Sequence, residues 1–331
     1  MTRRTGLPRI AIVGGGIGGL AAAAFLRREG FDSTVYEQAS RLGEVGAGLV
    51  VAPNAARQLR KLGVLDALRE RAVQLDTGWE FRRWQDGTVL SAENLADACE
   101  RRYGEQTYTA HRADLLRVIE ALVPPENIVL GHKCVAVEPG ARPRLRFADR
   151  QAVEADVVIG ADGVHSVVRG ALFGATPATY SGLCAFRALV PAEEAPGFAR
   201  RPAQTLWIGP GHHLVHYPVS SGEQVNLVAF APAGDYTMES WTATATVEEF
   251  LAEFAEWDGR LVDLIRAGGT PGRWALLDRA PLSHWSEGGT TLLGDAAHPM
   301  FPFFAQNDPL VANGWIYDYD PDVALGRTAL A

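Results

Sequence analysis

Cysteine is scarce in this chain, and no pair of cysteines has the spacing of a metal or redox site. Only three occur among 331 residues, Cys99, Cys134 and Cys184, and none forms a CxxC motif. An odd number of distant cysteines argues against a disulfide framework and a zinc site, and favours a reducing compartment. We therefore expect a cytoplasmic protein that has no metal centre.

Long apolar runs and a strong net charge are also missing. No stretch approaches the roughly 18 apolar residues that a membrane span requires, and the apolar segment 10–13 is too short for a signal peptide. Lys and Arg number 31 against 39 Asp and Glu, so the formal net charge is −8. Such a balance does not favour nucleic acids or anionic membranes as partners. The sequence leaves the oligomeric state open.

Glycine, by contrast, is concentrated in one turn near the start of the chain. Gly14, Gly16 and Gly19 form GxGxxG between a predicted buried strand and a predicted helix. The first glycine permits a tight turn, the second lets the backbone approach a pyrophosphate, and the third lets helix and strand pack closely. Glu37, at the end of the next predicted strand, can accept hydrogen bonds from ribose hydroxyls. The turn predicts a dinucleotide cofactor but does not separate NAD from FAD.

Further motifs narrow this choice. They are RLGEVGAG at 41–48, HRADL at 111–115, GADGVHSVVR at 160–169 and GDAAHP at 294–299. In this order the set resembles the flavoprotein aromatic hydroxylases of the p-hydroxybenzoate hydroxylase fold. The resemblance runs from about Arg9 to Gln306 and is nearest to the salicylate, 3-hydroxybenzoate and 6-hydroxynicotinate monooxygenases.

The resemblance implies a cofactor, a reductant and a reaction. FAD would be bound, NADH or NADPH would act as a transient reductant, and O₂ would hydroxylate a small hydroxylated aromatic or heteroaromatic acid through a flavin C4a-hydroperoxide. By the same resemblance Arg112 contacts FAD, Asp162 and Gly163 belong to a motif tied to FAD and the pyridine nucleotide, and Asp295 binds the ribityl chain. Plainer roles remain open: a surface arginine for Arg112, a turn acid for Asp162 and a turn cap for Asp295.

The predicted fold class is α/β, with a Rossmann-like FAD-binding domain interleaved with a smaller antiparallel-sheet substrate domain. We predict the FAD-binding domain at 1–75, 105–180 and 272–306, and the substrate domain at 76–104 and 181–271. Residues 307–331 resemble the C-terminal tail of such hydroxylases, yet they follow Gln306 directly. Several helices are missing between Gln306 and Asn307 by this comparison. Whether that segment is deleted from the protein or only absent from this sequence stays open.

A predicted strand at 213–219 carries the candidate catalytic residues. Alternation along a strand puts His213 and Tyr217 on one face, and His212 and His216 on the other. The resembling hydroxylases have a histidine and a tyrosine at this separation, as base and as substrate or flavin contact. Removing a phenolic proton makes a ring electron-rich, and a histidine with a pKa near 6.5 suits that transfer. We predict His213 as the base and Tyr217 as the contact; His212, His216 or no histidine are the alternatives.

Aromatic residues nearby could line an apolar pocket for the ring. The candidates are Trp207, Phe230, Phe301 and Phe303, each of which could equally belong to the core, and His298 is interpreted as a residue that shapes a loop. Two other functions remain as alternatives to hydroxylation. One is a flavin oxidoreductase that does not insert oxygen, and the other is an inactive flavin-fold binding protein, which the break after Gln306 motivates.

Overall fold

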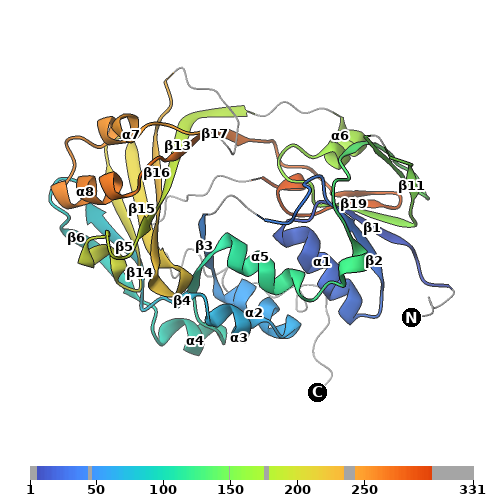
Figure 1. Ribbon diagram of the computed structural model, residues 1–331, viewed down its shortest axis with the longest axis horizontal. Helices are drawn as coiled ribbons and strands as arrows, with labels where there is room; N and C mark the ends of the chain where they lie inside the picture. The colour runs from blue at the N-terminus through green and yellow to red at the C-terminus, as the bar shows by residue number, and fades with distance from the viewer. Residues whose placement is uncertain (1–5, 44–46, 149, 175–178, 235–242, 300–331) are drawn as a thin grey trace. The chain divides into compact units, whose positions relative to one another are not determined.

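The structure is a computed structural model, and it describes residues 6–43, 47–148, 150–174, 179–234 and 243–299. The chain divides into two compact units, each built from segments that are distant in the sequence (Figure 1). The described residues of the first unit lie within 6–43, 115–179 and 277–299, and those of the second within 47–114 and 180–276. Within the described residues, no helix is long and apolar enough to cross a membrane.

The first unit contains a six-stranded sheet in the order β18-β19-β12-β1-β2-β8 and a three-stranded sheet in the order β11-β10-β9. In the larger sheet β18 and β19 pair antiparallel, and the other pairs are parallel. The elements are β1 (Ile10–Val13), α1 (Ile17–Arg28), β2 (Ser33–Tyr36), η1 (Pro125–Asn127), β8 (Ile128–Val129), β9 (Cys134–Glu138), β10 (Arg144–Phe147), β11 (Val153–Glu154), β12 (Val157–Gly160), α6 (Val167–Phe173), β18 (Ser286–Glu287), β19 (Thr290–Leu292) and η4 (Gly294–Ala296).

Strand β1 shows why this sheet is parallel and covered. All four of its residues are apolar and buried, and Ile12 pairs with Val35 on β2 and Ile159 on β12. A short, continuously apolar strand is typical of a parallel sheet that is buried on both faces. The predicted β1–α1–β2 beginning is therefore present, and it ends each strand at the same edge of the sheet.

The second unit contains a seven-stranded sheet in the order β17-β13-β16-β15-β14-β5-β6 and a three-stranded sheet in the order β3-β7-β4. The elements are β3 (Gly48–Val51), α2 (Pro53–Leu62), α3 (Leu65–Arg69), β4 (Val73–Gln74), β5 (Thr77–Arg83), β6 (Val89–Asn94), α4 (Ala98–Tyr103), β7 (Tyr108–His111), η2 (Gly197–Arg200), β14 (Ala203–Gly209), β15 (His212–Val219), η3 (Ser220–Gly222), β16 (Gln224–Pro232), α7 (Val247–Glu253) and α8 (Gly259–Ala267). Three elements cross the division between units: α5 (Arg112–Glu120), β13 (Thr179–Pro191) and β17 (Gly272–Asp278).

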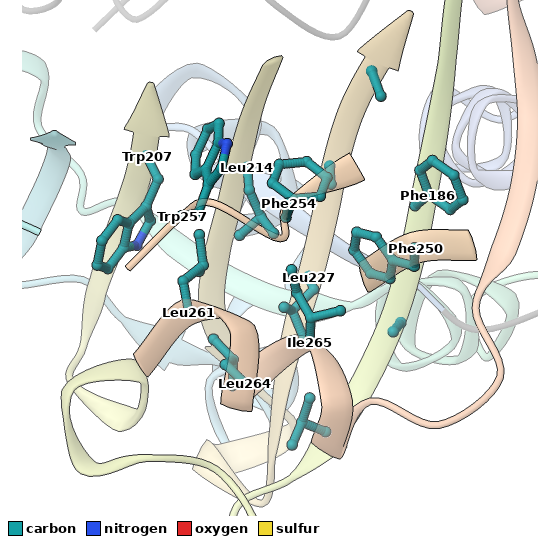
Figure 2. Packing of buried hydrophobic residues seen from close by; sticks show 14 of the residues in the cluster. Phe186, Trp207, Leu214, Leu227, Phe250, Phe254, Trp257, Leu261, Leu264 and Ile265 are labelled. Carbon is teal, nitrogen blue, oxygen red and sulfur yellow. The ribbon is translucent and has the colours of Figure 1, made fainter. Parts of the chain in front are cut away.

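One face of the seven-stranded sheet is buried under α7 and α8. Figure 2 shows apolar side chains of both helices against side chains of the strands, and the stacked rings of Phe186 and Phe250 have centroids 4.8 Å apart. The buried strand residues of this side include Trp207 on β14, Leu214 on β15 and Leu227 on β16. We call this side of the sheet the core face. The predicted α/β class with a second, separate sheet is confirmed, but this sheet is mixed and not purely antiparallel, because β14 pairs parallel with β5.

The division between the units differs from the predicted domain boundaries. The segments 45–75 and 105–114 were expected in the FAD-binding domain, and they cluster with the second unit instead. The small sheet explains this, because β3 pairs with β7 and is also tied to β16: the Gly48 N–H donates to Asn226 Oδ1 at 2.8 Å. Thr109 on β7 likewise donates to the Pro218 carbonyl at 2.6 Å.

Candidate active site

The glycine turn between β1 and α1 requires glycine at two of its positions. Gly14 has φ +107°, and a Cβ there would lie 2.2 Å from the Ala161 carbonyl oxygen. A Cβ at Gly19 would lie 2.0 Å from the Gly14 carbonyl oxygen. Both distances are far inside van der Waals contact, so any side chain would push α1 away from the sheet. These two glycines are therefore explained by packing, as the motif predicts.

Gly16 has a different reason to be glycine. Its φ of −73° and ψ of −177° suit any residue, and among the described residues nothing lies within 4 Å of a Cβ built there. Gly16 is the N-cap of α1, and no side chain caps this helix. Uncapped N–H groups at a helix N-terminus bind anions, and the space beside Gly16 is free to receive one. The turn therefore fits the pyrophosphate of a dinucleotide.

Glu37 lies directly after β2, beside this turn. Its carboxylate accepts hydrogen bonds from the Gly15 N–H at 2.7 Å and the Ala39 N–H at 2.8 Å. Each carboxylate oxygen has a second lone pair, so the side chain can still accept from a ribose hydroxyl. The structure thus brings Glu37 and the glycine turn together, and the contact with ribose stays a prediction.

Asp162 and Gly163 follow β12, and their visible role is to begin α6. The Asp162 carboxylate accepts hydrogen bonds from Ser166 Oγ at 2.5 Å and from the Val167 N–H at 2.7 Å. Burial raises the pKa of Asp162, although these hydrogen bonds favour its charged form. Gly163 has φ +78°, which other residues rarely adopt. The turn-acid role of Asp162 is thus present, and contact with a cofactor remains a prediction.

Asp295 lies in η4, after β19, and its side chain is exposed. Arg169 positions this turn, although the sequence reading assigned it no role. Its side chain is 3% exposed and donates to the carbonyls of Ala296 at 3.2 Å and Ala297 at 2.9 Å. Arg169 is the last residue of the motif at 160–169, so this motif is the sequence feature that could have indicated its role. The exposed Asp295 carboxylate is free of such structural duties and is available to a ligand.

Arg112 is the first residue of α5, and it belongs to the second unit. Its backbone N–H donates to the Ala47 carbonyl at 2.8 Å, which joins the start of α5 to the segment before β3. Arg112 also lies near enough to Arg187 on β13 that the two charges repel each other. The predicted contact between Arg112 and FAD stays a prediction.

The predicted catalytic pair lies on the side of the seven-stranded sheet opposite the core face. His213 pairs with Phe230, and Tyr217 pairs with Asn226. Paired residues of antiparallel strands share a face, and residues two apart return to it. We call this side the His213 face; its residues on β13, β15 and β16 include Arg187, His213, Val215, Tyr217, Asn226, Val228 and Phe230. The sequence alternation therefore separated the two faces correctly.

His213 is held as a neutral imidazole. Its ring stacks on Phe230 with a centroid separation of 4.5 Å and an interplanar angle of 25°. Burial, with a smaller contribution from His212, lowers the pKa of His213 to about 4. The expected value near 6.5 is therefore not the value of the ligand-free chain. A neutral imidazole can accept a proton, and the Phe230 ring provides an apolar surface on which an aromatic ring can lie.

Tyr217 is 5% exposed, and its phenol stays protonated because burial raises its pKa to about 12. Gly48 on β3 approaches it closely: a Cβ there would lie 2.7 Å from the Tyr217 ring and 2.6 Å from Asn226. This glycine belongs to the motif at 41–48, so part of that motif serves to pack β3 against the His213 face.

The alternative histidines lie on the core face and have partners there. His216 is 1% exposed and accepts a hydrogen bond from Trp207 Nε1 at 3.1 Å, and burial lowers its pKa to about 3. His212 Nε2 lies 3.0 Å from the Glu253 carboxylate. Trp207 is fully buried in the core and so does not line the His213 face. Phe301 and Phe303 lie outside the described residues, whereas His298 contacts the ring of Trp285.

The sequence of this chain is similar to a family model and to proteins of known activity. The model of a family described as FAD binding domain matches residues 8–306. The 3-amino-4-hydroxybenzoate 2-monooxygenase PtmB3 of Streptomyces platensis is 41% identical over 97% of this chain and 83% of that protein. The 6-hydroxynicotinate 3-monooxygenase of Pseudomonas fluorescens is 37% identical over 90% of this chain and 78% of that protein.

Solved structures agree on the fold. Salicylate hydroxylase in a substrate complex has a TM-score of 0.73 and 27% identity, covering 90% of this chain and 75% of that chain. HpxO of Klebsiella pneumoniae, complexed with FAD and uric acid, has a TM-score of 0.78 at 24% identity, covering 96% and 81%. The predicted flavoprotein resemblance is thus confirmed, and the chain belongs to the FAD binding domain family.

Proposed function

We propose that this chain is an FAD-dependent monooxygenase that hydroxylates a small hydroxylated aromatic or heteroaromatic acid, with NADH or NADPH as reductant. The observation that carries the proposal is the neutral His213 imidazole stacked on Phe230, on the side of the sheet that α7 and α8 leave uncovered. The names of the relatives, which act on amino-hydroxybenzoate and hydroxynicotinate, support this substrate class.

FAD, when bound and reduced, supplies the activation of O₂. The chain's residues bind the cofactor, orient the aromatic ring and accept its proton. Uncapped N–H groups of α1 would hold the pyrophosphate beside Gly16, and Glu37 would accept hydrogen bonds from the ribose. An aromatic ring lies against Phe230 with its hydroxyl toward His213. The imidazole takes the hydroxyl proton, so that electron density flows into the ring as it is attacked.

The low pKa of His213 shapes this step. At neutral pH the imidazole is unprotonated in nearly every molecule, so it is always ready to accept the proton. An isolated base of pKa about 4 would accept weakly from a phenol. Any anion bound near the ring favours the imidazolium and raises the pKa, so substrate binding itself strengthens the base.

The test is substrate-stimulated oxidation of NADH and NADPH by the FAD-loaded protein, across hydroxylated benzoates and nicotinates. We expect stimulation by an aromatic acid, with a product heavier by one oxygen. Stimulated oxidation that yields peroxide and unchanged ring would leave only a flavin oxidoreductase. A protein that retains FAD but responds to no aromatic acid would contradict the proposed substrate class.

A further inference from the structure

Arg187 is a charged residue on the His213 face for which the described part of the chain provides no anion. It lies on β13, pairs with Val228, and its guanidinium carbon lies 5.0 Å from the centroid of the Trp274 ring. Its Nε is buried and has no hydrogen-bond partner within the part of the chain that the structure describes. Nor does any described carboxylate form an ion pair with it. The strongest electrostatic neighbours of Arg187 are the Tyr217 phenol and the like charge of Arg112.

Such an arrangement is costly unless a ligand completes it. A guanidinium cannot shed its proton inside a protein, so it stays charged when it is buried. Arg187 is partly exposed as a residue, but its Nε is buried, and a charge that is withdrawn from water without a hydrogen-bonding counterion is unfavourable. The Tyr217 phenol cannot act as the counterion, since its pKa of about 12 keeps it neutral. Since none of the described residues supplies this counterion, an anion that arrives from solution would complete the arrangement.

Asn226 adds a second donor on the same face. It is fully buried, and its Oδ1 accepts the Gly48 N–H at 2.8 Å. Because only the oxygen of the amide can accept that hydrogen bond, the orientation of the amide is fixed and Nδ2 is the remaining donor. Nδ2 is buried and has no partner among the described residues. Asn226 lies two residues from Val228, the pairing partner of Arg187.

The spacing of these residues matches a small aromatic acid. Arg187 and His213 lie two strands apart and two residues apart along the sheet. With strands about 4.8 Å apart and about 3.4 Å per residue, their Cα atoms are roughly 12 Å apart. The Arg187 guanidinium lies over Trp274 of β17, on the other side of β13 from β15, so the span between it and the His213 imidazole is long enough for one substituted ring.

We propose that Arg187, together with Asn226 Nδ2, binds the carboxylate of the aromatic acid and makes the site specific for acids over neutral rings. This inference rests on the proposed function, and adds to it the group that recognises the acid. Arg187 would hold one end of the ring while His213 and Phe230 hold the hydroxylated end. The carboxylate would also be the anion that raises the pKa of His213.

The experiment measures equilibrium dissociation constants, not turnover. The FAD-loaded protein is titrated with 3-amino-4-hydroxybenzoate and with the matching carboxamide, by calorimetry or by the change in flavin absorbance. The wild type is expected to prefer the acid. Arg187→Met should weaken acid binding by about 10- to 100-fold and change amide binding by less than about 3-fold. Arg187→Lys should recover part of the preference, because an ammonium keeps the charge but not the planar fork.

A second variant and a matched control complete the design. The Asn226→Asp side chain can still accept the Gly48 N–H, but it places a carboxylate beside Arg187. Binding of the acid should therefore weaken at least about 10-fold, whereas binding of the amide should stay unchanged. The control is Arg273→Met, which removes the same group from the neighbouring strand β17, where Arg273 lies 5.0 Å over Phe186 of the core face. It should keep the wild-type preference for the acid.

Each outcome decides a different claim. Equal losses of acid and amide binding in Arg187→Met, or an unchanged preference for the acid, would overturn the role of Arg187 and leave the proposed function intact. A wild type that holds FAD and binds neither compound, nor any other pair of hydroxylated acid and amide, would overturn the proposed function and this inference with it.

Discussion

At the scale of single residues, burial decides which histidine can act as a base. His213 and His216 both have pKa values far below 6.5, yet only His213 lies on the face that the core does not cover. The alternation of side chains along β15 predicted this separation. What the sequence could not show is the low pKa of His213, because the value depends on the packing of Phe230 and on the nearby His212.

We expect His213→Asn to lower kcat by about 10²- to 10⁴-fold, because the proton would lose its acceptor. Asn keeps a polar planar group of similar size, so FAD and substrate binding should change little. Rates and dissociation constants measured on the same preparation check this. A variant with normal kcat would remove His213 from the mechanism, and a variant that no longer binds substrate would show a binding role instead.

The pH profile offers a separate check on the same residue. A base must be unprotonated in the free enzyme, so lowering its pKa extends activity toward acid. Since the pKa of His213 is about 4, kcat/KM should stay level from pH 7 down to about pH 5 and fall only below that. Rates should be read immediately after a jump from pH 7.5, before any unfolding. A fall centred near pH 6.5 would contradict the assignment.

At the scale of elements, the glycine turn separates packing from binding. Gly14 and Gly19 are needed for β1 and α1 to fit together, whereas no described residue lies within 4 Å of a Cβ built at Gly16. The sequence predicted all three from one motif, because the motif encodes a local structure that short-range sterics determine. The structure separates their roles, because the carbonyls of Ala161 and Gly14 lie against Gly14 and Gly19, respectively, and not against Gly16.

Gly16→Ala should leave folding unchanged and weaken the binding of FAD. The backbone at Gly16 suits alanine and a Cβ there meets none of the described residues, so the free energy of unfolding without FAD should stay within about 0.5 kcal/mol. The methyl group would occupy the space proposed for the pyrophosphate, so FAD affinity should fall at least about tenfold. Gly18→Ala is the control, since its Cβ would make only an ordinary contact with Leu293 at 3.7 Å. Equal FAD affinity in both variants would contradict the proposed binding mode.

Strand β15 also makes stability depend on pH. The pKa of His216 is about 3 when folded and near 6.5 when unfolded, so its contribution is fully present above pH 6.5 and is lost as pH falls toward 3. Between pH 7 and pH 5 this one histidine should cost about 2 kcal/mol of unfolding free energy. His216→Gln, which can still accept from Trp207, should be less stable at pH 7 but lose about 2 kcal/mol less over that range. Urea titrations of both proteins at pH 7 and pH 5 measure this difference. An equal loss of unfolding free energy in the two proteins would show that His216 is not responsible.

At the scale of the whole molecule, spaced motifs were easier to predict than strands whose partners are distant in the sequence. The motifs around the first unit's sheet are local, and they indicated the fold class and the cofactor correctly. Strands β3, β7 and β17 were missed, because each is defined by partners distant in the sequence. The Gly48 N–H on β3 donates to Asn226, 178 residues away, and this hydrogen bond ties β3 to the large sheet of the second unit. The roles of Arg187 and Asn226 were not predicted for the same reason, because their neighbours in the sheet are distant in the sequence.

The division into two units predicts where FAD and core mutations act. FAD at 100 times its dissociation constant should stabilise the folded protein by about 2.7 kcal/mol, and hydrogen exchange should slow first in β1, β12 and β19. Leu264→Ala, in the core under α8, should cost about 2–5 kcal/mol and speed exchange in β14, β15 and β16. Exchange mapped by segment checks both effects. Protection by FAD confined to the second unit would contradict the placement of the cofactor turn.

The central claim is that this chain inserts oxygen into an aromatic acid. The most direct test is a reaction of the FAD-loaded protein with NADH or NADPH, a hydroxylated benzoate or nicotinate, and oxygen-18 gas, followed by mass spectrometry of the product. The account predicts one oxygen-18 atom on the ring of the product and none in the product of His213→Asn over the same time. Consumption of the nicotinamide cofactor with no oxygen-18 in any aromatic product, across the whole panel, would contradict it.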